Sequence, residues 1–145
     1  MLKSGINYMT LDLVFKNYTS QKAPKESFFV KVLNAGLKAA KLKGKAEVSV
    51  NLVGEGKMRS LNKKHRNKDK PTDVLSFPLG GGNGDIFICL SIAKKEAKRE
   101  NVSIEAKLAQ LTVHGFLHLL GHDHEISSKE AKSMLKLEEK ILSNL

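Results

Sequence analysis

Four of the five histidines of this chain fall within residues 114–124. His114 and His118 are four positions apart, so on an α-helix they stand on one face, one turn from each other. Gly121 favours the end of such a helix, because glycine enters a left-handed conformation at little cost, and the chain can then return His124 to the same place. Imidazole nitrogens at this spacing can bind a zinc ion at about 2.0–2.1 Å. The sequence therefore predicts one zinc ion per chain, bound by His114, His118 and His124.

The same spacing is typical of the metzincin peptidases, which also use three histidines. Those peptidases carry a glutamate directly after the first histidine as the general base, and here Gly115 occupies that position. Glu105 and Glu125 do not have the helical register to replace it. Asp123 is the closer candidate for an accessory catalytic carboxylate. A metal site without the peptidase base is thus expected, and a metalloprotease is the less favoured alternative.

The number of ligands indicates the role of the metal. Three protein ligands leave a position open for water or substrate, whereas structural zinc is normally closed by four ligands that usually include cysteine. A catalytic ion is therefore expected, although a fourth ligand from Cys89 or Asp123 would make it structural. His122, on the turn, is interpreted as facing solvent or substrate, and His65 as a structural or helix-surface residue.

A second informative segment is residues 57–70, which hold seven basic residues and one acidic residue. Such density near one short helix predicts contact with a phosphate backbone, and the planar guanidinium of Arg59 or Arg66 can bind one phosphate at two points. A solvated helix face is the alternative interpretation. The residues predicted to bind RNA are Lys63, Lys64, Arg66 and Lys68.

The composition supports a nucleic-acid partner. The chain has 145 residues and a formal net charge of +10, and residues 85–145 carry nine basic and nine acidic residues, so the whole excess lies in residues 1–84. A positive surface of this kind attracts polyanions. The single cysteine, Cys89, excludes an internal disulfide and a multi-cysteine metal site and fits a reducing compartment. With no signal-like or spanning apolar segment, we expect a cytoplasmic protein without membrane contact.

Hydrophobic periodicity predicts the elements that must position these residues. Strands are expected at residues 9–17, 47–53, 74–77 and 85–90, and helices at residues 24–41, 57–66, 91–100, 103–120 and from a capping box at Ser127 and Glu130 to about residue 142. The glycine-rich residues 80–84 are expected to form a loop that joins the two flanking strands as a hairpin. This order predicts a single α+β domain over residues 1–145, with a small four-stranded, mostly antiparallel or mixed sheet covered by helices. The metal site would lie on a helix of the C-terminal half.

Three segments together resemble the bacterial YbeY family of zinc-dependent endoribonucleases, the rRNA maturation factors. They are the histidine segment 114–124, the segment 61–78 with its Pro-Thr-Asp-Val-Leu-Ser-Phe-Pro ending, and the Gly-Asp-Ile-x-Ile segment 84–88. Many relatives have tyrosine where this chain has His65 and His122. The resemblance implies an αβα arrangement with a small mixed sheet. It also implies cleavage of single-stranded RNA, maturation of the 3′ end of small-subunit rRNA, and ribosome quality control, with the small ribosomal subunit and assembly factors as partners.

The resemblance assigns metal binding to His114, His118 and His124 and a catalytically important basic role to Arg59. The resulting hypothesis is a single-strand-specific, metal-dependent endoribonuclease. Zinc would lower the pKa of its water toward about 7, or act as a Lewis acid while the RNA 2′-OH attacks, and Arg59 would stabilise charge on the phosphate. The alternatives are a metzincin-like metalloprotease and a non-enzymatic ribosome assembly factor with structural zinc.

Overall fold

The computed structural model describes residues 10–40, 44–121 and 128–145. Its elements in chain order are β1 Thr10–Asn17, α1 Glu26–Ala40, β2 Lys45–Val53, α2 Glu55–Arg66, β3 Val74–Gly80, β4 Asn83–Cys89, α3 Leu90–Glu100, α4 Ile104–Leu119 and α5 Ser128–Ser143. The predicted strands and helices are all found at their predicted places, with shifted ends. The capping box at Ser127 lies outside the described residues. In the described part of the chain, no helix is long and apolar enough to cross a membrane.

The four strands form one mixed sheet in the order β1-β2-β4-β3. β1 pairs with β2 and β2 with β4 in parallel, and the edge strand β3 pairs antiparallel with β4. Parallel neighbours need a long crossover, which α1 supplies between β1 and β2. The sheet is therefore mixed, which is one of the two predicted forms, and two of its three strand pairs are parallel.

The prediction of a loop over residues 80–84 is wrong at both ends. β3 continues to Gly80 and β4 begins at Asn83, and these two residues pair across a turn made by Gly81 and Gly82. Both turn residues have positive φ, +66° and +84°, which glycine adopts at little cost and which a two-residue hairpin turn requires. The glycine run therefore closes a tight hairpin.

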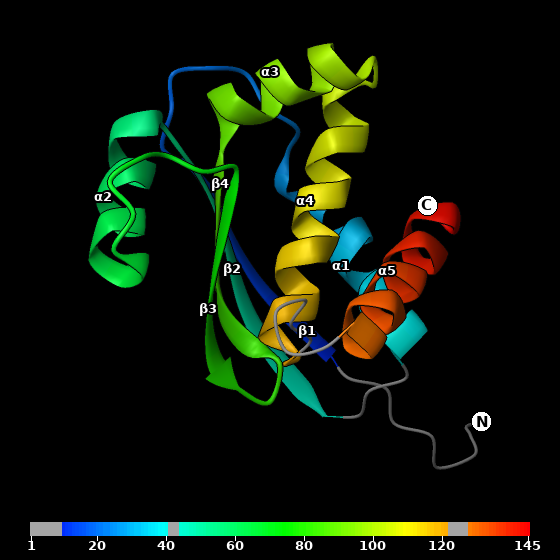
Figure 1. Cartoon of the computed structure of the whole chain (residues 1–145). Coiled ribbons are helices and arrows are strands. Elements are labelled where there is room, and N and C mark those ends of the chain that lie inside the picture. The colour runs from blue at the N-terminus through cyan, green and yellow to red at the C-terminus, as the bar shows by residue number, and fades with distance from the viewer. Residues whose placement is uncertain (1–9, 41–43, 122–127) are drawn as a thin grey trace, which may run out of the picture.

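Helices cover the two faces of the sheet unequally (Figure 1). α1 and α4 lie on one face with α5 packed outside them, α2 lies on the other face, and α3 crosses one end of the sheet. The larger core lies between the sheet and the α1–α4 layer and includes Phe29, Leu33, Val50, Ile86, Ile88, Leu108 and Phe116. A smaller cluster under α2 consists of Val53, Met58, Leu75 and Cys89. These layers confirm the expected α+β, αβα-type architecture.

Candidate active site

Helix α4 brings His114 and His118 together, as their spacing predicted. The helix begins after Ser103, whose side chain accepts a hydrogen bond from the Ala106 amide at 3.0 Å and so caps it. The two imidazole rings are 4.7 Å apart between centroids, and their Nε2 atoms are 3.2 Å apart. Two nitrogens bound to one tetrahedral zinc ion are separated by about 3.3 Å. The pair therefore has the separation that a shared ion requires.

A buried carboxylate stands behind the first histidine. Glu138 of α5 is 8% exposed, and its Oε1 lies 3.2 Å from Nδ1 of His114. When Nδ1 carries the proton and donates it to Glu138, the lone pair of the ring is on Nε2, the atom that faces His118. The contact thus sets the orientation and the tautomer that a metal ligand needs.

Sequence reasoning missed Glu138, although the chain contains a signal for it. The buried side chains Met134 and Ile141 of α5 lie four residues before and three residues after Glu138. Residues at this spacing share one face of a helix, so Glu138 is a carboxylate on an otherwise apolar face. A charged side chain is rarely placed there without a partner, so this position indicates that Glu138 has a partner in the folded chain.

Gly115 holds α4 against the sheet beside the histidines. A Cβ atom at this position would lie 2.9 Å from Cγ2 of Ile86 and 3.0 Å from Oγ of Ser76. The Ser76 hydroxyl donates a hydrogen bond to the Gly115 carbonyl at 3.0 Å, which joins β3 to α4. The position where metzincin peptidases carry their glutamate is therefore filled by the sheet, and no side chain fits there without displacing it.

Helix α4 ends where the sequence predicted. Gly121 has φ +93°, and its amide donates to the carbonyl of His118 at 3.0 Å. The remaining predicted residues of this segment, His122, Asp123 and His124, lie outside the described residues. Across residues 10–40, 44–121 and 128–145, no group of three or more candidate metal ligands is assembled. His114 and His118 are thus the described part of the predicted site.

Cys89, considered as a fourth ligand, lies on the opposite face of the sheet. It is fully buried in the cluster under α2, and its sulfur is 3.6 Å from Oγ of Ser91. The histidines lie on α4, which packs against the other face through Gly115. Because the sheet separates the thiol from the imidazoles, the structure does not bring Cys89 into the candidate site.

The predicted basic residues lie on and after α2. Nε of Arg59 donates to Oδ1 of Asp69 at 2.8 Å, and Nζ of Lys63 is 3.9 Å from Oδ2 of the same carboxylate. The hydrogen bond from Arg59 lowers the pKa of Asp69, and the charges of Arg59 and Lys63 add to this effect. The hydrogen bond to Asp69 and the charge of Asp69 raise the pKa of Arg59. The exposed residues Lys63, Lys64, Arg66 and Lys68 continue this surface, which we call the α2 basic surface together with Arg59.

The structure does not place Arg59 beside the histidines, because α2 and α4 cover opposite faces of the sheet. Strand β3 is the edge strand between them. The ring of its Phe77 packs against the ring of His65 in α2, with 4.6 Å between centroids, while the hydroxyl of Ser76 donates a hydrogen bond to α4. His65 is accordingly an exposed residue of the helix surface, as interpreted from the sequence. The α2 basic surface and the histidine pair therefore flank the same sheet edge.

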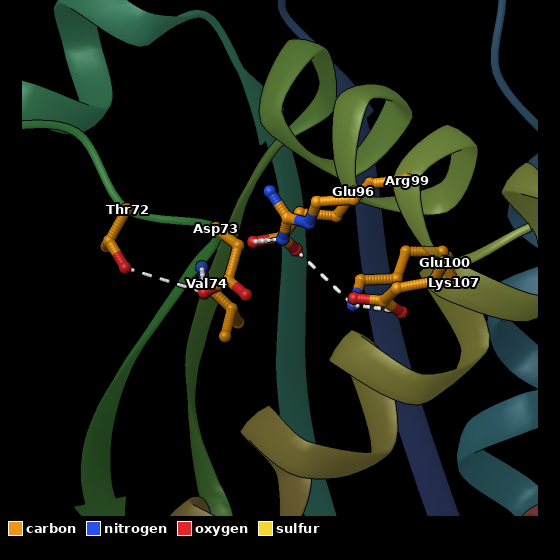
Figure 2. Close-up of polar contacts among 7 residues, drawn as sticks. All are labelled: Thr72, Asp73, Val74, Glu96, Arg99, Glu100 and Lys107. Carbon is orange, nitrogen blue, oxygen red and sulfur yellow. Dashed lines mark hydrogen bonds and ion pairs between the residues drawn. The ribbon is translucent and has the colours of Figure 1, made fainter.

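A separate ionic cluster, which sequence reasoning did not find, lies at the other end of α4 (Figure 2). Nζ of the buried Lys107 is 2.9 Å and 3.0 Å from the two carboxylate oxygens of Glu100 and 3.4 Å from Oε1 of Glu96. Burial lowers the pKa of Lys107, but the bonds and charges of both glutamates outweigh it and raise this pKa overall. Burial, followed by the nearby charge of Asp73, raises the pKa of Glu96.

The fold and the site together define an αβα protein whose helix α4 presents two converging imidazoles. Comparison with known proteins agrees with this fold. The chain matches the family described as Endoribonuclease YbeY over residues 14–145. It is 45% identical over 105 residues to Endoribonuclease YbeY of Aquifex aeolicus (strain VF5), covering 68% of this chain and 70% of that protein. It is 40% identical over 107 residues to Endoribonuclease YbeY of Persephonella marina (strain DSM 14350 / EX-H1), covering 68% and 70%.

A solved structure is similar over most of the chain. The solution structure of TM1509 from Thermotoga maritima has a TM-score of 0.61 and 31% sequence identity, covering 92% of this chain and 87% of that one. The chain belongs to the YbeY family of endoribonucleases. Endoribonucleases are hydrolases that cut within RNA chains, so the substrate class is RNA.

Proposed function

We propose that this chain is a single-strand-specific, zinc-dependent endoribonuclease of the cytoplasm. It would act in maturation of the 3′ end of small-subunit rRNA and in ribosome quality control, with the small ribosomal subunit and assembly factors as partners. The observation that carries the proposal is the pair of Nε2 atoms of His114 and His118, 3.2 Å apart, with Glu138 behind His114. In a family of RNA-cleaving proteins, a ligand pair prepared in this way is best explained by metal-assisted cleavage of a phosphodiester.

The proposed ligands are His114, His118 and His124, with one zinc ion per chain. When bound, zinc supplies Lewis acidity at neutral pH, which polarises a phosphoryl oxygen and favours deprotonation of a coordinated water or of the 2′-OH. The chain itself contributes orientation. Glu138 lies 3.2 Å from Nδ1 of His114, where it can accept a hydrogen bond from the tautomer that has its lone pair on Nε2, and the contact of Gly115 with the sheet fixes the helix that carries both rings. Asp123 is retained as the candidate accessory carboxylate.

The α2 basic surface is proposed to hold the RNA backbone. The guanidinium of Arg59 is anchored through Nε to Asp69, and within the described residues its terminal nitrogens have no other acceptor. A phosphate can therefore be bound at the outer edge of this guanidinium, where charge that develops on the phosphate would be stabilised. Because α2 and α4 flank the β3 edge, a strand that crosses this edge can contact the basic surface and the histidines together.

The two alternative functions fit the site less well. A peptidase of the metzincin type lacks its glutamate, and the contact of Gly115 with Ile86 and Ser76 leaves no room for one. A non-enzymatic factor with structural zinc would need the ion for its fold. Here the larger core, between the sheet and the α1–α4 layer, is formed by apolar side chains that do not include the histidines.

The test is cleavage of a labelled rRNA 3′-end precursor, with the zinc content of each protein measured. We expect His114→Ala to lose zinc and at least about 100-fold in rate, because an ion of this kind supplies several kcal/mol of transition-state stabilisation. Arg59→Ala is expected to lose about tenfold or more. The control Arg99→Ala, at an exposed position outside the α2 basic surface, should cleave like the wild type.

Two outcomes would contradict the proposal. Equal cleavage by all the variants would indicate a contaminating nuclease, and robust hydrolysis of casein by the zinc-loaded wild type would favour the peptidase. The product ends then separate the two chemical routes. A 2′,3′-cyclic phosphate indicates attack by the 2′-OH, whereas cleavage of a substrate with a deoxy sugar at the scissile position excludes it.

A further inference from the structure

The face of the sheet that carries α2 has a cavity that the histidine site does not use. Its volume is about 540 Å³, and its lining residues are Tyr18, Asn51, Val53, Gly54, Lys57 and Phe87. It lies where β1 and β2 end and α2 begins, because Tyr18 follows β1 and Gly54 separates β2 from α2. The cavity combines aromatic rings, one buried amide and one cation, which is the composition of a ligand site rather than of a packing defect.

The amide of Asn51 is fixed and offers an acceptor. Asn51 is 8% exposed, and its Nδ2 donates to Oγ of Ser49 at 2.9 Å and to the carbonyl of Ile86 at 3.2 Å. Ser49 is held in turn by its hydrogen bond to Asp85, at 2.6 Å. Because Nδ2 is engaged inside the protein, the atom that Asn51 presents to an occupant is Oδ1. Because Oδ1 is a hydrogen-bond acceptor, an occupant with an N–H group is favoured.

Two aromatic rings line the same cavity. Tyr18 is 60% exposed although it is a large ring, and Nζ of Lys16 lies 4.9 Å from its centroid. Phe87 is partly buried and is held edge-on by Phe77, with 5.6 Å between centroids. Planar rings that are fixed at a surface and accompanied by lysine are typical of sites at which single-stranded nucleic acids stack their bases.

Phosphate can be bound at the mouth of the cavity. Gly54 precedes α2 without a side-chain cap, so the first amides of this helix point outward next to Lys57, for which the described residues provide no ion-pair partner. The carboxylate of Glu55 in the same turn is directed away, to Oγ of Ser91 at 2.8 Å and Nζ of Lys95 at 3.5 Å. The local charge therefore favours an anion beside the rings.

We propose that this cavity binds one unpaired nucleobase of the RNA substrate. The base stacks on Tyr18 or Phe87 and donates an amino or imino hydrogen to Oδ1 of Asn51, and its phosphate lies at Lys57 and the start of α2. This inference rests on the proposed function, since it names a substrate subsite for the same reaction. The sheet lies between the cavity and the histidines, so a bound strand runs from the cavity across α2 and over the β3 edge to the cleavage site.

Tyrosine fluorescence provides a direct test. The chain has no tryptophan and two tyrosines, so a Tyr8→Phe background leaves Tyr18 as the only tyrosine. We expect a single-stranded RNA of about 12 nucleotides to quench this fluorescence, whereas an abasic strand of the same length, which keeps the phosphates, leaves it unchanged. Quenching by the abasic strand to the same extent would overturn the proposal.

Affinity and cleavage measured on the zinc-loaded protein complete the test. Tyr18→Ala should raise the Kd for the RNA about tenfold, and Lys57→Ala should raise it by a smaller factor and flatten its salt dependence. The controls Val102→Ala and Lys98→Ala change exposed residues outside the cavity and should leave Kd unchanged.

The failure of this inference is distinguishable from failure of the proposed function. An RNA that is cleaved by the wild type, with Kd equal for the wild type, Tyr18→Ala and Lys57→Ala, would remove the base subsite and leave the nuclease in place. An RNA that quenches Tyr18 but is not cleaved by the zinc-loaded protein would remove the nuclease and keep the subsite.

Discussion

The two ends of helix α4 carry different kinds of side-chain cluster, an ion-pair cluster at one end and a pair of histidines at the other. At the N-terminal end, the ammonium of Lys107 is 6% exposed and lies within 3.4 Å of two carboxylates, Glu100 and Glu96. At the C-terminal end, the Nε2 atoms of His114 and His118 face each other at 3.2 Å, and the carboxylate of Glu138 lies beside Nδ1 of His114.

The difference separates a structural cluster from a functional one. Opposite charges around Lys107 compensate one another and link α4 to α3. Two imidazoles gain no charge compensation from each other, and their convergence is useful when a third species accepts both lone pairs. Removing a residue at the first end should therefore affect stability, and removing one at the second end should affect metal binding and cleavage.

The largest effect on stability is expected from Lys107→Met. It removes the cation from a buried cluster, so Glu100 loses its partner in the cluster and Glu96 keeps only the longer contact with Arg99, at 3.9 Å. The free energy of unfolding should fall by about 3 kcal/mol, the lower end for a broken buried pair, because Glu100 is partly exposed. Urea denaturation measures it, with the exposed Lys98→Met as the control. A change below about 0.5 kcal/mol in Lys107→Met would show that the cluster is not structural.

Glu138→Gln should act on the metal and leave the fold nearly unchanged. The amide keeps the size of the side chain, but it accepts the Nδ1 proton of His114 less strongly than a carboxylate does. Zinc affinity should fall about 10- to 100-fold, as for other partners of this kind. Competition with a chelator measures it, and the neighbouring exposed Glu139→Gln is the control. Equal zinc affinity in both variants would remove the orienting role of Glu138.

Gly115→Ala tests the contact that positions the histidines. Alanine normally stabilises a helix interior relative to glycine by about 1 kcal/mol, and Gly56, in the first turn of α2 with no atom within 4 Å of its Cβ position, should show a gain of the same sign. At Gly115 the new methyl group meets Ile86 and Ser76, so we expect a loss of about 1–2 kcal/mol instead. Thermal unfolding of the two variants compares them, and equal stabilisation would show that α4 can move away from the sheet.

The smallest effect is a change in how stability depends on pH. Burial and the charge of Asp73 raise the pKa of Glu96, so the folded chain holds this proton more tightly than the unfolded chain does. The contribution of Glu96 is therefore present at low pH and is lost as the pH rises through its folded-state pKa. Relative to Glu96→Gln, the wild type should lose stability as the pH rises above the ordinary pKa of a glutamate side chain. A pH-independent difference would contradict this sign, and Glu139→Gln is the control.

Local patterns predicted the parts of the molecule that depend on local spacing. The four strands, the five helices and the pairing of His114 with His118 follow from periods of two and of three to four residues. The left-handed end of α4 at Gly121 follows from the conformational freedom of glycine. The glycine run indicates a hairpin connection, but its composition does not show that Gly81 and Gly82 alone form the turn.

The contacts between distant residues were not predictable in this way. Glu138 is 24 positions from His114, and Ser76 is 39 positions from Gly115, so neither partnership leaves a local period in the sequence. The Lys107 cluster likewise depends on how α3 meets α4. That Arg59 lies across the sheet from the histidines is a consequence of strand order, which composition and charge do not encode.

The most direct test measures cleavage and stability at the two ends of α4 in parallel. Single-turnover cleavage of the rRNA precursor and thermal unfolding would be recorded for the wild type, His118→Ala and Lys107→Met. We predict that His118→Ala loses at least about 100-fold in cleavage with little change in Tm, and that Lys107→Met loses several degrees in Tm but cleaves normally below its transition. Cleavage by folded His118→Ala at the wild-type rate would contradict the assignment of the histidine pair as the catalytic centre.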